Sequence, residues 1–325
     1  MSELRWNPIL REWVIVATHR QDRPLMPTKT CPFCVGSEEV PKNYDLLVLP
    51  NRFPSLHECP PAPDIEGDDF YRVAPAKGYC EVVLYSSEHN TTLAQQSNRR
   101  ILNLILLWRE RFDFIGSKEE IKYVMVFENK GEEIGVTLPH PHGQIYGYPF
   151  IPPKAQQELD SAREHYIDKG GCIFCQVQSE EFRDGRRIVA QNERFFAFIP
   201  FFARWPYEVH IYPRRHMESI LELDMDDALS LASILKDVLV GYDHLFGFSM
   251  PYIMILHQRP TDGKEYPYYH FHFEFYPPRR SKDKIKYLAG CESGAGTYIN
   301  DTKPEEKAAE LRKAIEEGRK SATEG

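Results

Sequence analysis

The sequence lacks the features that would place it in a membrane or on nucleic acid. No run of about 18 apolar residues occurs in the 325-residue chain, so no membrane span is predicted. A formal net charge of −8 leaves no overall basic surface of the kind that nucleic acid requires, and we expect no nucleic-acid partner. The first residues also contain no apolar stretch typical of a secretory signal peptide.

Cysteine is scarce, and its arrangement argues against a disulfide framework. The chain has seven cysteines, an odd number, and four of them form two Cys-x-x-Cys pairs. Such pairs are more typical of thiolate metal sites in a reducing compartment than of a secreted, disulfide-linked fold. We therefore expect a cytoplasmic protein that binds metal.

Potential metal ligands occur twice along the chain in the same order. The first Cys/His group is Cys31, Cys34, His89 and His140, and the second Cys/His group is Cys172, Cys175, His216 and His270. In each half another histidine follows two residues later, at His142 and His272. A duplication of a unit of about 140 residues explains this recurrence most simply. The predicted domains are residues 1–152 and 153–325.

The hydrophobic pattern predicts the same elements in both halves. Strands are expected at 79–85, 121–127 and 143–148 in the first half, and at 187–189, 195–199, 207–212, 252–256 and 270–276 in the second. Long amphipathic helices are expected at 93–114 and 226–246, with charged helices at 153–168 and 304–320. The predicted fold class is α+β, in which each half is an antiparallel sheet with one long helix packed on it.

Two cysteines and two histidines form a common closed, tetrahedral ligand set for Zn²⁺. The first Cys/His group would leave no position for water, so we predict a structural zinc that fixes the loop carrying His142. A redox role for Cys31 and Cys34 is the alternative, but no thioredoxin-like βαβ pattern surrounds them.

The second metal site is less sharply defined by the sequence. The second Cys/His group predicts zinc by the same reasoning. A competing set consists of Glu158, His257, His272 and Glu274, whose harder ligands suit iron or zinc. His257 is as readily explained as a core histidine, so the choice between these sets stays open at this point.

His142 is the candidate nucleophile. The two histidines are expected to serve different purposes, so that His140 binds metal while His142 turns toward a substrate. A neutral imidazole can attack phosphorus and form a phosphoramidate. Gln144 shares the face of His142, and its amide could donate to a phosphoryl oxygen as charge develops. The alternative, that His142 is a further metal ligand, is disfavoured because four better-spaced ligands precede it.

Other polar segments are candidates for binding phosphate or sugar. Arg20 and Arg23 lie in one predicted loop and could bracket a diphosphate. The polar, glycine-bearing segments 127–131 and 135–137 lie shortly before the His-Pro-His run and could line the same pocket. Each of these segments alone is more often an ordinary loop, and 286–292 alone is more often a solvated charged run.

Together these motifs resemble those of the galactose-1-phosphate uridylyltransferase family, a branch of the histidine-triad superfamily. The resemblance covers nearly the whole chain and is most specific at Phe-Glu-Asn-Lys-Gly (127–131) followed by His-Pro-His-Gly-Gln (140–144). It implies tandem histidine-triad domains, a homodimer and a zinc ion in the first Cys/His group. It also implies a ping-pong reaction in which His142 takes the uridylyl group of UDP-glucose and passes it to galactose 1-phosphate.

The same resemblance implies positions that contact substrate. Those for the nucleotide or phosphate are Arg20, Arg23, Asn51, Asn129, Thr137 and Gln144, and those for the hexose are Lys286, Tyr287 and Glu292, possibly across a dimer.

Two departures from the family pattern leave the nucleotide and the acceptor open. Many members have a histidine where this chain has Glu274, and Cys172 with Cys175 instead resemble the plant ADP-glucose phosphorylase type. One alternative is therefore an ADP-sugar phosphorylase, in which inorganic phosphate attacks the intermediate. Two others are a histidine-triad hydrolase, which releases free nucleotide, and a zinc-stabilised nucleotide-binding protein without turnover.

Overall fold

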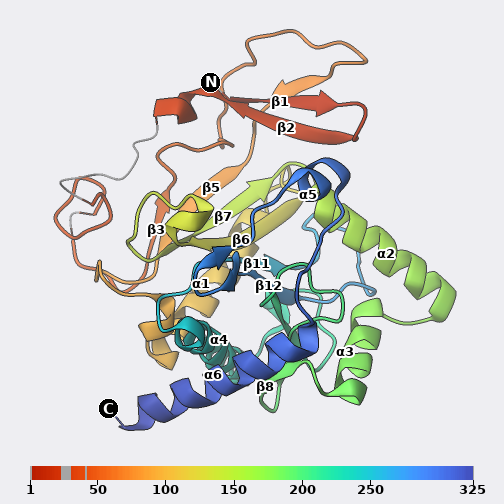
Figure 1. Cartoon of the computed structure of the whole chain (residues 1–325). Helices are drawn as coiled ribbons and strands as arrows, with labels where there is room; N and C mark the ends of the chain where they lie inside the picture. The colour runs from red at the N-terminus through yellow and green to blue at the C-terminus, as the bar shows by residue number, and fades with distance from the viewer. Residues whose placement is uncertain (1, 23–30, 41, 325) are drawn as a thin grey trace.

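A single nine-stranded sheet forms the centre of the molecule. The structure, a computed structural model, describes residues 2–22, 31–40 and 42–324 (Figure 1). The strand order is β3-β5-β7-β6-β11-β12-β10-β9-β8, and neighbouring strands are antiparallel. In that order the strands are Leu47–Pro50, Tyr79–Leu84, His142–Tyr148, Tyr123–Lys130, Tyr252–His257, His272–Tyr276, Val209–Pro213, Phe195–Phe198 and Ile188–Gln191.

The two halves of the chain meet in the middle of this sheet. β6 of the first half pairs with β11 of the second, with Val126 opposite Leu256. On either side of this seam the order is repeated, as β5-β7-β6 in one half and β10-β12-β11 in the other. The predicted α+β class and the antiparallel sheet in each half are confirmed, but the two sheets are continuous. The boundary between residues 152 and 153 stays a prediction.

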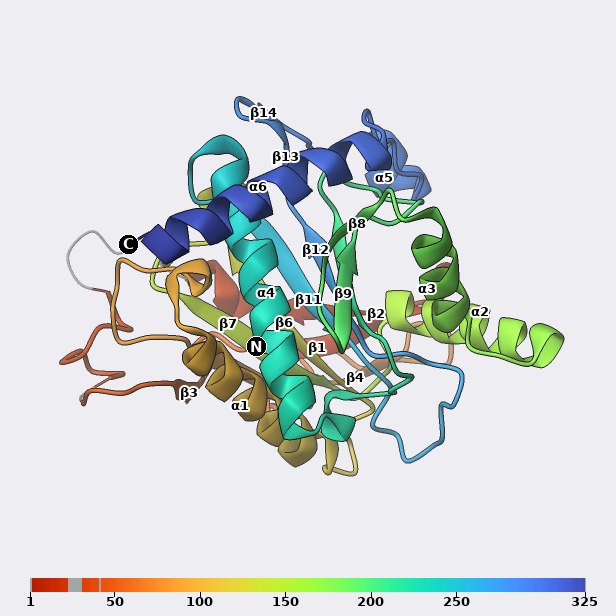
Figure 2. The ribbon, with the colours of Figure 1, turned by 90° about the horizontal axis from the view of Figure 1, so that it is seen from below.

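Three long helices cover one face of the sheet (Figure 2). They are α1 (Asn98–Gly116), α4 (Met225–Phe246) and α6 (Pro304–Glu324). In α1, apolar residues recur at helical spacing, and Ile101, Ile105 and Trp108 are fully buried in the main core. The predicted start at 93 was too early, because Ser97 accepts a hydrogen bond from Arg100 N and caps the helix.

The opposite face of the first half is covered by a small sheet near the N-terminus (Figure 1). Its order is β2-β1-β4, which are Glu12–Ala17, Ser2–Asn7 and Val73–Pro75. Leu4 of β1 packs with Cys80, and Tyr146 and Tyr148 of β7 lie against them. Alternate residues of β7 therefore face two environments, the helix-covered core and the side that carries His142.

The remaining helices lie at the outside of the second half. The predicted charged helix at 153–168 is α2 (Pro153–Lys169), and α3 (Ile173–Asp184), which was not predicted, follows it. Short elements complete the described chain: η1 (Thr18–Asp22), η2 (Leu93–Gln95), η3 (Glu132–Ile134), η4 (Ile220–Glu222), β13 (Arg279–Ser281), β14 (Lys284–Ile285) and α5 (Gly290–Ala295). None of the helices in the described ranges combines the length and hydropathy that a bilayer crossing demands.

Candidate active site and metal sites

His142 is the first residue of β7, and its ring is oriented by the backbone. Its Nδ1 lies 2.7 Å from the carbonyl oxygen of His140, so Nδ1–H donates and the lone pair is on Nε2. The ring of Phe33 packs edge-on against it, with centroids 5.3 Å apart. This geometry selects the tautomer whose Nε2 is the nucleophilic nitrogen.

Two cavities of about 380 Å³ meet at His142. The first, here called the Gln144 cavity, is lined by Phe33, Phe53, Thr137 and Gln144. The second, here called the Asn129 cavity, is lined by Asn129, Glu128 and Lys130, together with hydroxyl, amide, histidine and apolar side chains. A group bound at His142 can therefore extend in two directions.

Gln144 lies on the same face of β7 as His142, as predicted from the spacing. Its Oε1 accepts hydrogen bonds from Asn51 Nδ2 at 3.4 Å and from the Tyr146 hydroxyl at 3.3 Å. Because the oxygen is occupied by these donors, the amide nitrogen is the atom left to donate to a substrate oxygen. Thr137 and Asn51 line the same cavity, and Asn129 lines the other.

Several predicted substrate-binding residues lie elsewhere. Arg20 in η1 donates to the Phe53 carbonyl at 2.6 Å, beside the turn that holds Asn51, but it lines neither cavity. Arg23 lies outside the described residues. Lys286 is buried with its Nζ 3.0 Å from Glu292 Oε1, whereas Tyr287 is 72% exposed. Within one chain this segment lines neither cavity at His142.

The first Cys/His group is brought together as predicted. All four ligand atoms lie within 4.8 Å of one another, and Cys34 Sγ is 3.4 Å from His89 Nδ1 and 3.8 Å from His140 Nδ1. His140 Nε2–H donates to the Ser86 carbonyl at 2.7 Å, so its Nδ1 lone pair faces the thiols. Burial lowers the pKa of His140 and keeps it neutral.

The donor chemistry of this group fits a metal cation. Burial raises the pKa of the Cys31 thiol to about 11, so a cation is needed to hold its sulfur as a thiolate at neutral pH. Since His140 also accepts the hydrogen bond that orients His142, a metal here would support the candidate nucleophile through one residue.

The second Cys/His group repeats this geometry. Cys175 Sγ is 3.5 Å from the Nδ1 atoms of both His216 and His270. His270 Nε2 lies 3.2 Å from the Pro213 carbonyl, and His272 Nδ1 lies 2.8 Å from the His270 carbonyl. The predicted duplication therefore extends to side-chain orientation: the rings of His270 and His272 contact backbone carbonyls through the same nitrogens as those of His140 and His142.

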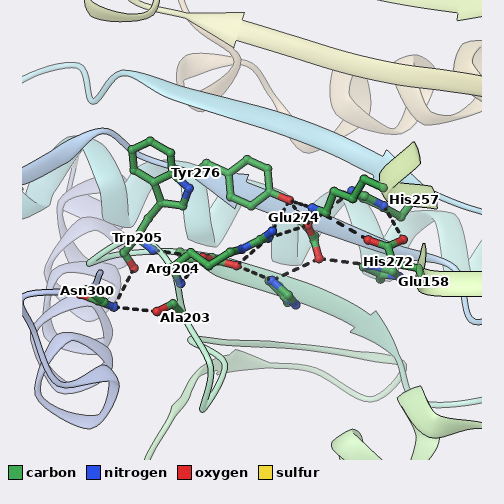
Figure 3. A network of polar contacts seen from close by, with 12 residues as sticks. Glu158, Ala203, Arg204, Trp205, His257, His272, Glu274, Tyr276 and Asn300 are labelled. Carbon is green, nitrogen blue, oxygen red and sulfur yellow. Dashed lines mark hydrogen bonds and ion pairs between the residues drawn. The ribbon is translucent and has the colours of Figure 1, made fainter. Parts of the chain in front are cut away.

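The competing set is assembled as well, so the two sets are not exclusive. Glu158, His257 and His272 have ligand atoms within 4.8 Å of one another, and Glu158 Oε2 is 3.0 Å from His257 Nδ1. Glu274, the fourth predicted member, lies beside them, with Oε2 3.4 Å from His257 Nε2 and Oε1 3.5 Å from His272 Nε2. Its Oε2 is also 2.6 Å from Lys154 Nζ and 3.3 Å from Arg204 (Figure 3). We call Glu158, His257 and His272 the Glu/His group.

In the second half, the histidine that corresponds to His142 is buried. His272 is 1% exposed and stacks on His257, with centroids 4.9 Å apart. Glu274 stands where the first half has Gln144, and Figure 3 shows Arg204 and Tyr276 directed at it. The half-buried His142 at two cavities is therefore the better candidate for reaction with a substrate.

Glu128 is a buried carboxyl at this site that sequence reasoning did not single out. It lies on β6 beside Asn129, is 4% exposed, and its Oε1 accepts from the Tyr252 hydroxyl at 3.1 Å. Burial raises its pKa to about 7, although Lys130 and the tyrosine hydroxyls oppose the shift. The sequence places it only in the polar segment 127–131, without a role of its own.

The raised pKa of Glu128 predicts a pH-dependent stability. Its folded pKa of about 7 lies above the ordinary value of 4.5. The free energy of unfolding that depends on this group is therefore greatest below pH 4.5 and falls as pH rises through 7. The difference corresponds to about 3 kcal/mol. Glu128→Gln removes this loss. In urea unfolding, the free energy of unfolding of the variant relative to that of the wild type should therefore rise between pH 5 and pH 8.5. A constant difference over that range would contradict the shift.

Family models and relatives agree on one family. The model for the N-terminal domain of galactose-1-phosphate uridyl transferase matches residues 1–152, and the model for its C-terminal domain matches residues 158–323. The galactose-1-phosphate uridylyltransferase of Thermotoga maritima is 42% identical over 96% of this chain and 98% of its own length. The rat enzyme of the same name is 32% identical over 96% of this chain and 87% of its length.

Solved structures give the same result. A uridylyltransferase structure has a TM-score of 0.89 and 39% identity, covering 97% of this chain and 99% of that one. An ADP-glucose phosphorylase from Arabidopsis thaliana, with bound ADP-glucose, has a TM-score of 0.74 and 26% identity over 96% of this chain and 98% of that one.

Proposed function

Because the chain belongs to the galactose-1-phosphate uridylyltransferase family, we propose that it exchanges a uridylyl group between two hexose 1-phosphates. UDP-glucose and galactose 1-phosphate give glucose 1-phosphate and UDP-galactose. The group is carried on His142, whose Nδ1–H donates to the His140 carbonyl where the two cavities meet. That oriented imidazole is the observation on which the proposal rests.

In the first step His142 Nε2 attacks the α-phosphorus of UDP-glucose. The N–P bond forms as the bond from that phosphorus to the bridging oxygen breaks, and glucose 1-phosphate leaves with the electron pair. The ring gains positive charge, which the hydrogen bond from Nδ1–H to the His140 carbonyl stabilises. The amide of Gln144 donates to a non-bridging oxygen, where negative charge accumulates.

In the second step a phosphate oxygen of galactose 1-phosphate attacks the same phosphorus, and the N–P bond breaks. The acceptor is already ionised at neutral pH, so the reaction needs no strong general base. One phosphoanhydride replaces another, and the overall equilibrium lies near unity. Positioning and electrostatic stabilisation therefore supply most of the rate.

The two cavities suggest how the substrate lies. The nucleotide occupies the Gln144 cavity, where Phe33 and Phe53 offer apolar contact and Asn51 and Thr137 offer polar contact. Asn129, in the other cavity, contacts the phosphate or hexose that leaves or enters. Gln144 binds a phosphate oxygen, whereas the assignment of Arg20 and Arg23 to phosphate rests on the family resemblance, because Arg20 lines neither cavity.

The hexose contacts are assigned to Lys286, Tyr287 and Glu292 from the partner chain of a homodimer. This assignment is supported by their position away from His142 within one chain and by the 72% exposure of Tyr287.

Zinc is the metal that suits both Cys/His groups, because two thiolates and two imidazoles complete a tetrahedral shell. Both ions would be structural, holding the loops that precede β7 and β12. The Glu/His group offers a carboxylate and two imidazoles, a set that suits iron or zinc. No step of the transfer uses these ions.

A reducing compartment, the cytoplasm, suits these thiols. All seven cysteines lie in the described ranges and are free, and four of them are in the Cys/His groups.

The second candidate is an ADP-sugar phosphorylase with the same nucleophile. It is favoured by the second Cys/His group and by the similarity to the Arabidopsis ADP-glucose phosphorylase. In that reaction inorganic phosphate, rather than a hexose 1-phosphate, attacks the histidine-bound nucleotide.

Product analysis with paired substrates decides between these reactions. We expect UDP-galactose from UDP-glucose with galactose 1-phosphate, at a rate at least about a hundredfold above that of ADP-glucose with inorganic phosphate. Preferential formation of ADP from the second pair would replace the uridylyl assignment. Steady release of UMP without any acceptor would instead identify a hydrolase.

A further inference from the structure

We propose that Glu128 is a positioning residue for the transfer: through the Tyr85 and Tyr252 hydroxyls it fixes the backbone of β7 between His142 and Gln144. The inference rests on the function proposed above. It assigns a role to a buried carboxyl that the two reaction steps do not use.

Tyr85 contacts the nucleophile strand on both sides of His142. Its backbone N–H donates to the Pro141 carbonyl at 3.0 Å, immediately before His142. Its side chain lies beneath Gly143, immediately after it: a Cβ on that glycine would collide with the hydroxyl and lie 2.9 Å from Tyr85 Cζ. Gly143 therefore allows a close approach that no other residue would permit.

Glu128 lies beside this contact, on the helix-covered face. Phe127 is paired with Gln144, so in the continued register Glu128 faces Gly143. The Tyr85 hydroxyl and Glu128 Oε2 are both buried without a hydrogen-bond partner among the described residues, and the carboxyl raises the pKa of the fully buried hydroxyl. The Tyr252 hydroxyl, from the second half of the chain, donates to Glu128 Oε1. Glu128 thus joins the nucleophile strand to the central seam of the sheet.

The charged groups around Glu128 are few and already paired. Lys130 lies 3.1 Å from Asp243 Oδ1 and over the ring of Tyr252, at 5.1 Å from its centroid. Asp243 Oδ1 also accepts from the Met250 N–H. The hydrogen bond that the described structure gives this carboxyl therefore comes from the Tyr252 hydroxyl and not from a cation, and Oε2 is the oxygen left to accept from the Tyr85 hydroxyl.

The second half of the chain shows that the sheet does not need this polar arrangement. Ile255 is paired with Glu274 as Phe127 is with Gln144, so Leu256 corresponds to Glu128, and Phe273 to Gly143. Leu256 and Phe273 are both fully buried. The same strands therefore form with two apolar side chains where His272 is closed off. A buried carboxyl at this position costs stability. Of the two matching positions, it occupies the one in the half with the open histidine.

Positioning of this strand bears directly on the rate. His142 must reach the phosphorus and Gln144 must reach its oxygen at the same time, and the two residues are joined only through Gly143. Displacing a reacting group by about 1 Å can cost about a hundredfold in rate. Packing of Tyr85 and Glu128 against the backbone of β7 at Gly143 restricts that displacement.

The test is the single-turnover rate at which UDP-glucose converts His142 to its uridylyl adduct, followed by rapid quenching and intact-protein mass. The variants are Glu128→Leu, Glu128→Gln and Tyr85→Phe. Tyr242→Phe is the matched control, because Tyr242 is equally buried and donates to a backbone carbonyl away from His142. Tm and metal content are measured alongside.

Glu128→Leu should lower the adduct rate by about a hundredfold with the KM for UDP-glucose within about threefold of wild type and no loss of Tm. Glu128→Gln, which still accepts from Tyr252, should recover to within about threefold of wild type, and Tyr85→Phe should lose about tenfold. Tyr242→Phe should leave the rate unchanged.

A wild-type rate in Glu128→Leu would overturn the positioning role and leave the proposed function intact. If Glu128→Leu instead loses its fold, Tyr85→Phe decides, because it keeps the ring packing: a wild-type rate there also overturns the inference. Absence of any adduct in the wild-type enzyme would overturn the proposed function first and the positioning role with it.

Discussion

Replacing His142 with alanine abolishes both the covalent adduct and the exchange of hexose 1-phosphates. Wild-type enzyme incubated briefly with UDP-glucose and no acceptor gains one uridylyl group by intact mass, whereas His142→Ala gains none. Exchange should fall on the order of a millionfold, the scale observed when a covalent nucleophile is removed from an enzyme. The fold should survive, because the His142 ring is half-buried and lines cavities rather than the core.

His244→Ala is a suitable control for the loss of a histidine, since His244 is exposed on α4 and outside both cavities. It should form the adduct like the wild type. An adduct that persists in His142→Ala would move the nucleophile to another residue. An adduct formed only from ADP-glucose would keep His142 and change the nucleotide.

Replacing Cys34 with serine should remove the metal of the first Cys/His group and destabilise the protein. Cys34 Sγ faces both histidines of the group, and a serine hydroxyl is a poor substitute for thiolate. We expect a loss of about 4 kcal/mol or more, the scale of losing a structural metal. In a chain of this size that lowers Tm by roughly 6 °C. Transfer activity should fall too, because His140 would no longer be fixed beneath His142.

Metal analysis and calorimetry check this prediction together. Cys59→Ser is the matched control, since Cys59 is exposed and belongs to neither Cys/His group. Cys175→Ser should lower zinc content by a similar amount through the second group while leaving the loop before β7 in place. Full zinc content in Cys34→Ser would show that the assigned ligand shell is wrong.

The two Cys/His groups could be predicted because each contains a short Cys-x-x-Cys motif and the same order of ligands occurs in both halves. A Cys-x-x-Cys pair is a turn that points both sulfurs at one ion, and a His-x-His run accompanies it in each half. The tautomers set by Ser86 and Pro213 could not be predicted, because these carbonyls approach the rings only in the folded chain.

The joining of the two halves was not predicted, for a different physical reason. Strand periodicity reports which face of a strand is buried but not which edge it presents to a neighbour. The pairing of β6 with β11 therefore left no signature in either half. The Glu/His group was recognised by residue type, although Glu158 reaches it from α2. The ion pair of the neighbouring Glu274 with Lys154 could not be predicted, because Lys154 approaches only in the folded chain.

The seam between β6 and β11 has a consequence for the origin of the chain. Cut between the halves, each piece would expose the full edge of a long central strand, and such edges readily pair with another chain. A single ancestral unit would have covered that edge with a second copy of itself, through a two-fold interface. Fusion made the contact intramolecular and independent of concentration. In the joined chain one histidine, His142, faces two cavities, whereas its counterpart His272 is enclosed.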